Sequence, residues 1–414
     1  MAGTVALGPH NRKPELRALT GLRAIAALAV VVSHTGVPKS LPEPFANIAH
    51  WGYIGVPLFF MLSGVVLAYN YPELTFRQTR RTVKFYVARV ARVMPLYWAM
   101  IAYCVLFYFA VNHEQYWWGL VQNIAAVQTW GPDLLVAQSY YNGPGWSIGV
   151  ELFFYALFPF IVPVIAGIAR RNGARGLVAV ILGAAAIVFG LCAYFVLSGR
   201  INLPATDGGS AHRWIYRNPL AHLPLFIAGV AVSFLLPYVR RWKPSTHHLM
   251  QTAIVLYVLL LAAFRGEGGW WPAGSYGAFF VLPFTLLLLS LGSQHGWLAR
   301  FLSTGPMVML GVASFAVYLT HRWLVWQLSS TDAISKGHGW APYAGFLLTI
   351  AILLLVGEGA HRYVEEPARR WVIKISKRLA NRFPARRTPA PPPIPEQADQ
   401  SAVTQQLPVI TAAR

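Results

Sequence analysis

Arg23 and His34 are the first residues of this sequence whose types and spacing could do chemistry. They lie eleven positions apart in an apolar segment, which on an α-helix puts them roughly 20° apart around the axis and about 16 Å apart along it. A neutral imidazole can take a proton from a hydroxyl near neutral pH, and a guanidinium can hold a carboxylate or a phosphate. This shared face therefore predicts a polar passage through most of the membrane. The alternative is an arginine that extends to the membrane surface and an interfacial histidine.

Arg89 and Arg92 form a second pair with a chemical use. They are three positions apart and precede an apolar segment, so they face the same way on a helix. Two forked guanidiniums at the cytoplasmic mouth of a passage are suited to phosphate groups. Ordinary positive charge at the cytoplasmic end of a span is the alternative interpretation.

Glu151 is an acid within an apolar segment. A charged group at the bilayer centre costs about 2.5–3.5 kcal/mol on insertion scales, so this carboxylate needs a partner or a task. We expect it to orient the His34 imidazole or to neutralise an arginine, either Arg23 or Arg322. Tyr155, four residues later on the same helical face, is a candidate donor to a developing oxyanion.

Four further polar residues are candidates for the site. Ser33 or Ser63, like His34 itself, could carry a covalent acyl intermediate, although Ser63 also suits small-residue helix packing. Ser147 and His321 are the other two. We expect His321 either to join the site or to lie at the membrane interface.

We expect the acidic residues near the end of the apolar region to have structural roles. Glu358 and His361 are three positions apart on one face and are expected to pair with each other. Glu365 and Glu366 precede a proline beside basic residues, which is typical of a helix end.

The elements that carry these residues are long apolar segments. Of the 414 residues, 56% are hydrophobic and 12% are charged, whereas soluble domains have about 45–50% apolar and 25% charged residues. This composition excludes a soluble cytosolic enzyme and a disordered protein. A spanning helix needs about 20 apolar residues, so this composition predicts an all-α, polytopic membrane protein. We expect about ten transmembrane helices, at residues 18–37, 52–71, 94–112, 146–168, 176–197, 219–238, 248–264, 274–292, 305–328 and 342–363.

The distribution of charge predicts the orientation of these helices. The chain has 34 Lys and Arg residues and a formal net charge of +20. With the N-terminus in the cytoplasm, most of these residues fall in cytoplasmic segments, as the positive-inside rule requires. Both termini are therefore expected in the cytoplasm. The basic charge then reflects topology and contact with anionic lipid, and not a nucleic-acid partner.

We expect one membrane domain between two terminal segments. Residues 1–17 form a cytoplasmic N-terminal segment without a cleavable signal peptide, 18–378 the transmembrane domain, and 379–414 a Pro-rich disordered cytoplasmic tail. The loop at 111–145 is rich in Trp and Tyr, which suits the membrane interface, a re-entrant segment or stacking on sugar rings. The two cysteines predict no disulfide, and no His/Cys/Asp cluster has the spacing of a metal site.

Taken together, these motifs resemble the acyltransferase-3 family of bacterial integral membrane acyltransferases. The resemblance extends from about residue 16 to residue 370. It includes an Arg-x10-His signature at Arg23 and His34 and an Arg-x-x-Arg pair at Arg89 and Arg92. The other segments are residues 52–64, 146–155 with the pattern Trp-Ser-x-x-x-Glu-x-x-x-Tyr, 314–321 and 365–367. Each motif is weak alone, but their order on a ten-span frame is specific.

The resemblance implies an enzyme that transfers acyl groups other than amino-acyl groups. The donor would be a cytoplasmic acyl-CoA, by default acetyl-CoA, and the acceptor a hydroxyl of a cell-envelope or exported carbohydrate or glycosylated product. It implies that His34 is the base, that Arg23 is essential with it, and that Arg89 and Arg92 lie near the acyl-CoA. It also implies a multi-pass protein of the bacterial inner membrane. Many relatives carry an extracytoplasmic hydrolase-like domain, whereas only a short tail follows here, so the membrane domain is expected to act alone or with a separate extracytoplasmic partner enzyme.

A transporter or flippase for a glycosylated or acylated small molecule is the alternative. Charged residues within spans also mark substrate pathways and proton relays. A transporter, however, has no need of a phosphate-suited arginine pair on the same passage as His34. A purely structural scaffold would leave the buried polar residues unexplained. The acceptor stays open among exopolysaccharide, lipopolysaccharide, peptidoglycan, a glycolipid and a macrolide sugar.

Overall fold

The computed structural model describes residues 14–111, 117–130, 143–264, 266, 268–329 and 340–382. All regular elements in these ranges are helical, which confirms the expected fold class. The elements are α1 (Arg17–Thr35), α2 (Glu43–His50), η1 (Trp51–Ile54), α3 (Gly55–Asn70), α4 (Thr79–Val111), α5 (Trp117–Ile124), η2 (Gly143–Gly145), α7 (Trp146–Leu197), η3 (Arg200–Asn202), η4 (His212–Arg217), α8 (Pro219–Val239), α9 (Pro244–Ala263), α10 (Trp270–Ala273), η5 (Gly274–Ala278), α11 (Val281–Gly292), α12 (Trp297–Leu302), α13 (Gly305–Ser329), α14 (Ala341–Ala360), η6 (His361–Glu365) and α15 (Glu366–Arg382).

Nine helical stretches in the described part of the chain are long and apolar enough to cross a membrane. The spans expected at 146–168 and 176–197 lie in one of them, because both belong to α7. Gly173 breaks α7 with a φ of 56° and a ψ of −144°, a conformation that glycine adopts far more readily than other residues. The two expected spans are thus the two arms of a single broken helix.

The third expected span begins too late. α4 starts at Thr79, and Arg89 and Arg92 lie inside the membrane-spanning stretch Thr79–Phe107. They were expected on a helix just before the span that begins at residue 94, at its cytoplasmic mouth. The first turns of this helix are rich in Arg, Lys and Thr, so hydropathy alone leaves them out of the span.

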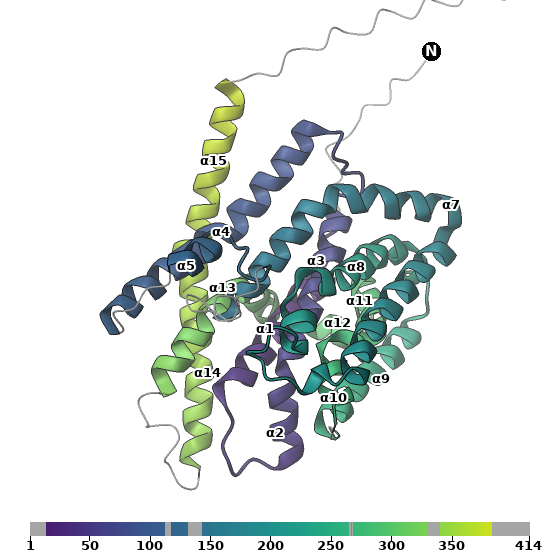
Figure 1. Cartoon of the computed structure of the whole chain (residues 1–414). Helices are drawn as coiled ribbons and strands as arrows, with labels where there is room; N and C mark the ends of the chain where they lie inside the picture. The colour runs from purple at the N-terminus through teal and green to yellow at the C-terminus, as the bar shows by residue number, and fades with distance from the viewer. Residues whose placement is uncertain are drawn as a thin grey trace, which may run out of the picture. The chain divides into compact units, whose positions relative to one another are not determined.

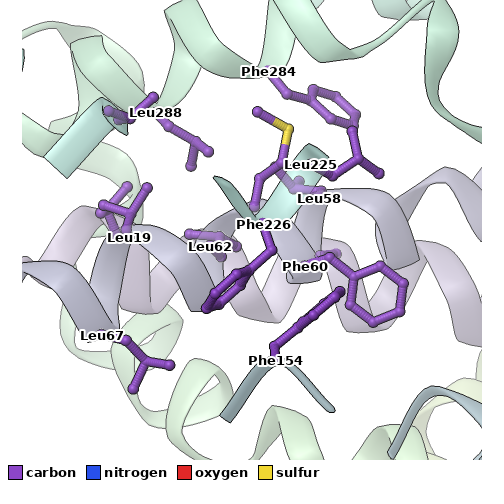
Figure 2. Packing of buried hydrophobic residues seen from close by; sticks show 14 of the residues in the cluster. Leu19, Leu58, Phe60, Leu62, Leu67, Phe154, Leu225, Phe226, Phe284 and Leu288 are labelled. Carbon is purple, nitrogen blue, oxygen red and sulfur yellow. The ribbon is translucent and has the colours of Figure 1, made fainter. Parts of the chain in front are cut away.

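Helix packing is tight between α1 and α13, between α3 and α8, and between α7 and α8. In Figure 1, α3 and α8 lie side by side. Figure 2 shows the apolar side chains between these helices. Phe154 of α7 and Phe226 of α8 stack with their ring centroids 4.6 Å apart and an interplanar angle of 14°. Leu62 of α3 is also fully buried in this cluster.

Two glycines allow helices to approach closely. A Cβ on Gly311 of α13 would overlap the carbonyl oxygen of Thr20 in α1, and a Cβ on Gly64 of α3 would overlap that of Phe226. Small residues at helix contacts let backbones approach in a bilayer, where lipid gives no hydrophobic drive for association. The contact at Gly311 holds α13 against α1, and these two helices carry His321 and His34.

Large apolar side chains cover the outer surface of the helices. Leu106, Leu249 and Leu355 have 73%, 73% and 72% of their surface exposed. The last spanning stretch, Ala341–Ser376, is apolar although only 17% of its most apolar window is buried. Exposed apolar surface of this extent is unfavourable in water and suits contact with lipid. The protein is therefore a multi-pass membrane protein.

The chain divides into two compact units, Met1–Ile373 and Lys374–Arg414. The first unit contains all the candidate site residues. In the second unit, residues 374–382 form the end of α15. The Pro-rich part of the expected tail, from residue 383 onward, lies outside the described residues, and so does most of the expected N-terminal segment.

Candidate active site

The candidate site consists of two cavities whose walls share Val56 and Tyr318. The first, termed the basic cavity, has a volume of about 110 Å³. Its polar lining residues are Arg23, Ser63, Arg89, Arg92, Ser147, Glu151, Tyr155, Ser314 and Tyr318. The second, termed the aromatic cavity, has a volume of about 590 Å³. Its polar and aromatic lining residues are Ser33, His34, His50, Tyr53, Trp146, His212, Tyr216, Arg217, Tyr276, Tyr318, His321 and Arg322.

α1 contributes one residue of the expected pair to each cavity. Arg23 lines the basic cavity and His34 lines the aromatic cavity. The continuous passage expected along this helix face is therefore divided into two chambers. Val56 of α3 and Tyr318 of α13 lie where the chambers adjoin.

Arg89 carries an unsatisfied donor in the basic cavity. Its guanidinium lies 5.9 Å from the ring centroids of both Tyr71 and Phe85. Its Nε is buried and has no hydrogen-bond partner among the described residues. A buried charged donor without an acceptor is unfavourable. Arg89 is thus prepared to receive an acceptor oxygen from a ligand.

Glu151 lies with the arginines in the basic cavity and away from His34. It is the single carboxylate among the described lining residues of that cavity, beside Arg23, Arg89 and Arg92. Ser63 Oγ donates to Glu151 Oε1 over 3.1 Å, and the hydroxyl of Tyr155 donates to the same oxygen. This placement favours neutralisation of the arginines over orientation of the imidazole.

The hydrogen bonds of Glu151 also limit or support the chemical roles of its two partners. The Tyr155 proton is directed at Glu151, so this tyrosine is not aimed at an oxyanion. Ser63 Oγ is held beside a carboxylate that could accept its proton, so the serine is still a candidate nucleophile.

The His34 imidazole is fixed in one tautomer by its own helix. Its Nδ1 lies 2.8 Å from the carbonyl oxygen of Val30. A carbonyl only accepts hydrogen bonds, so Nδ1 carries the proton and Nε2 carries the lone pair. α1 ends one residue later, at Thr35, and Gly36 follows with a φ of 71°. His34 is thereby positioned in the last turn, at the wall of the aromatic cavity.

His321 is buried against His34, in the wall of the aromatic cavity. It is 1% exposed, and its ring centroid lies 5.1 Å from that of His34. Its Nδ1 donates to the carbonyl oxygen of Tyr318 over 2.5 Å, and its Nε2 lies 3.4 Å from His34 Nδ1. The bare Nε2 of His321 therefore faces the N–H of His34 and supports the same tautomer.

Two rare π-helical turns, η4 and η5, form much of the aromatic cavity. η4 supplies His212, Tyr216 and Arg217, and η5 supplies Tyr276. η4 stops at Asn218, whose side chain accepts a hydrogen bond of 2.9 Å from Leu220 N and so caps α8. π-helical turns occur frequently at functional sites.

The residues of η4 were not expected to be site residues. The one available signal is the run of basic and aromatic residues at 212–217 directly before Asn218 and Pro219, a helix start signal. Burial, together with the charge of Arg217, lowers the pKa of His212 to about 4. Burial also raises the pKa of Tyr216 and lowers that of Arg217. At neutral pH, His212 and Tyr216 are therefore uncharged.

The remaining candidates make local contacts. Ser147 Oγ donates to the carbonyl oxygen of Pro144 over 3.0 Å, and Ser33 Oγ donates to that of Val30 over 2.8 Å. Both hydroxyl protons are thus engaged by the backbone. Among the residues that the structure describes, no group of three His, Cys, Asp or Glu side chains is arranged to hold a metal ion.

The expected pairing of Glu358 with His361 is wrong. Glu358 pairs with Arg362 over 2.5 Å, and His361 Nδ1 pairs with Glu365 over 2.9 Å. Each partner is four residues away on its helix, where side chains meet best. None of these residues lines either cavity.

The motifs and the paired cavities can be compared with known proteins. A family model described as an acyltransferase domain matches residues 16–357. The chain belongs to this acyltransferase family. The match covers every residue assigned above to the two cavities, and it confirms the resemblance stated from the motifs. No solved structure matches the chain.

Curated members of this family are similar to the chain over most of its length. It is 28% identical over 382 residues to acyltransferase MdmB of Streptomyces mycarofaciens, covering 87% of this chain and 93% of that protein. It is 22% identical over 389 residues to O-acetyltransferase OatA of Staphylococcus aureus, covering 86% of this chain and 57% of that protein. Peptidoglycan O-acetyltransferase OatA of Listeria monocytogenes is 21% identical over 380 residues, with 85% and 55% covered. The chain thus spans little more than half the length of the OatA proteins.

Proposed function

We propose that this family member is an acyl-CoA-dependent O-acyltransferase of the bacterial inner membrane. It transfers an acyl group, by default acetyl, to a hydroxyl of a carbohydrate or glycosylated acceptor. The observation that carries the proposal is the hydrogen bond from His34 Nδ1 to Val30 O. That bond leaves a lone pair on Nε2, in a residue that lines a 590 Å³ cavity, as a general base requires.

The basic cavity is the donor side in this proposal. It has three arginines and one carboxylate among its described lining residues, so it favours an anionic ligand such as the phosphates of coenzyme A. The buried Nε of Arg89 lacks a partner, and a phosphate oxygen would satisfy it. Under the positive-inside rule this side faces the cytoplasm, where acyl-CoA is made.

The aromatic cavity is the acceptor side. His34 Nε2 removes the proton from an acceptor hydroxyl, and the oxygen attacks the thioester carbonyl. The tetrahedral intermediate collapses, the carbon–sulfur bond breaks, and the coenzyme A thiolate takes the proton from the imidazolium. The thioester would have to reach the junction at Val56 and Tyr318. Glu151 balances part of the arginine charge, and the acyl-enzyme route through Ser63 is the alternative order of steps.

Names of the relatives support an acylated carbohydrate or glycosylated product. The Listeria relative is named a peptidoglycan O-acetyltransferase and the Staphylococcus relative an O-acetyltransferase. The lining of the aromatic cavity, with five aromatic residues besides its histidines, is compatible with sugar rings. The acceptor would be modified on the extracytoplasmic side.

The test is release of free thiol from acetyl-CoA by purified protein in nanodiscs, with crude envelope glycans as acceptors. We expect wild type to release thiol and His34→Ala to lose at least about 100-fold in rate, as for loss of a general base. His248→Ala is the matched control, because His248 contacts Arg300 and lines neither cavity. Equal rates for wild type and His34→Ala contradict the assignment of the base.

A transporter is the competing function. It would move a glycosylated or acylated molecule and leave every thioester intact. If no acyl-CoA is consumed, while labelled glycoside crosses proteoliposomes only when the protein is present, the transporter assignment replaces the enzyme.

A further inference from the structure

We propose that the aromatic cavity binds an acceptor sugar that carries an anionic group, a carboxylate or a phosphate, with Arg217 as its main anchor. This inference rests on the proposed function, in which that cavity is the acceptor side, and it names the chemical class of the acceptor.

The charged side chains described in the wall of the cavity are all basic. Among the described residues, no Asp or Glu lines it, whereas Arg217 and Arg322 do, together with four histidines. The charge of Arg322 contributes to the lowered pKa of Arg217, so the two cations repel each other across the cavity. An anion between them removes this repulsion, and a cationic amino sugar would add to it.

A cluster of aromatic rings lies beside the same arginine. The Arg217 guanidinium lies 5.8 Å from the ring centroid of Trp146. The ring of Tyr216 has its centroid 4.9 Å from Trp146, 5.0 Å from Tyr276 and 6.1 Å from Tyr53. Flat rings offer stacking surface to the C–H face of a sugar, and the phenol hydroxyls can hydrogen-bond to its hydroxyls. A simple inorganic anion would have no use for this surface.

The backbone around the arginine is built in an unusual way. Arg217 is the last residue of one π-helical turn and Tyr276 lies in a second, in which Gly277 has a φ of 150°. The Asn218 cap on α8 then fixes where η4 ends. Such turns persist where the surrounding structure holds a functional geometry. Both turns direct residues into one cavity, so the feature belongs to a binding site more readily than to packing.

The anchor and the base share one chamber. His34 of α1 and Arg217 of η4 both line the aromatic cavity. An acceptor held by its anionic group at Arg217 would present its hydroxyls to the rest of the chamber, including the lone pair of His34. Binding energy at the anion would thus serve to position the reacting hydroxyl.

The experiment compares four small probes by ligand-observed NMR titration of the full chain in nanodiscs, without acyl-CoA. The probes are methyl β-D-glucuronide, glucose 6-phosphate, methyl β-D-glucoside and glucosamine. We expect at least one anionic probe to bind about tenfold or more tightly than the glucoside, because charge-assisted hydrogen bonds to arginine are strong. Glucosamine is expected to bind most weakly. The better of the two anions identifies carboxylate or phosphate as the group.

Variants assign the preference to its residue. Arg217→Gln should bind the anionic probe and the glucoside about equally, and Arg217→Lys should retain part of the preference. Arg213→Gln is the control, because Arg213 lies in the same turn, 5.3 Å from the Trp214 ring centroid, and does not line the cavity. Thermal unfolding checks that each variant is folded.

Three outcomes overturn the proposal. They are equal binding of the glucoside and both anions by wild type, binding of neither anion, and an anion preference unchanged in folded Arg217→Gln. Thiol release from acetyl-CoA by the same preparation tests the proposed function separately. Thiol release without an anion preference refutes only this inference, and an anion preference without consumption of any acyl-CoA refutes only the enzyme.

Discussion

Replacement of His321 tests how the His34 imidazole is supported. The proton on His34 Nδ1 is held mainly by Val30 O at 2.8 Å, and His321 Nε2 is a second acceptor at 3.4 Å. The longer contact is near the limit for a hydrogen bond. We assign it about 1 kcal/mol, typical of a net hydrogen bond. His321→Leu, which removes the acceptor and keeps a buried apolar volume, should therefore lower kcat by about fivefold.

The assay is acyl-CoA-dependent thiol release at saturating donor, with kcat and KM measured separately. His321→Gln can still accept a hydrogen bond and should lose less than His321→Leu. The double variant His34→Ala/His321→Leu should be no slower than His34→Ala, because His321 acts only through His34. A folded His321→Leu as inactive as His34→Ala, or additive losses in the double variant, would refute the reasoning, since His321 would then have its own chemical role.

Three further predictions follow from the two cavities and the helix contacts. Arg89→Gln should raise KM for acetyl-CoA about tenfold with little change in kcat, whereas the exposed control Arg81→Gln should not. Gly311→Ala should lower the midpoint of thermal unfolding by several degrees, because its Cβ overlaps Thr20 O and overpacking of this kind costs about 1–3 kcal/mol. Gly305→Ala should leave the midpoint unchanged, because a Cβ at that position has no atom within 4 Å. Because the folded pKa of His212 is about 4, below the ordinary value near 6.5, protonation favours the unfolded chain. Stability should fall as pH drops from about 6.5 towards 4, and less so in His212→Gln.

Local spacing was sufficient for several features of the site. Eleven positions on one helix place Arg23 and His34 on the same side, and both line cavities, although these are two cavities where one passage was expected. Three positions place Arg89 and Arg92 together, and both line the basic cavity. Periodicity within a helix depends only on backbone geometry, so it can be calculated without knowledge of the fold.

Partners from other helices could not be predicted in the same way. Glu151 lies with Arg23 in the basic cavity, in line with one of its two expected roles, but its hydrogen bonds to Ser63 and Tyr155 were not expected. For His321 two places were left open, the site or the membrane interface, and it is buried against His34, 287 positions away in the chain. Which residues meet across helices depends on how closely the backbones approach, and here that is set by contacts such as Gly311 with Thr20.

The sequence by itself determined the membrane class, because apolar runs of spanning length have no other stable solution, and it determined the family, because ordered motifs survive in the chain. It also determined the chemical types in the site. Only the tertiary structure decided that Arg23 and His34 lie in separate chambers, since the residues between them come from α3 and α13. It alone placed Arg217 and the rings of η4 and η5 in the same cavity as His34, because π-helical turns and inter-helix packing are long-range outcomes that no local pattern encodes.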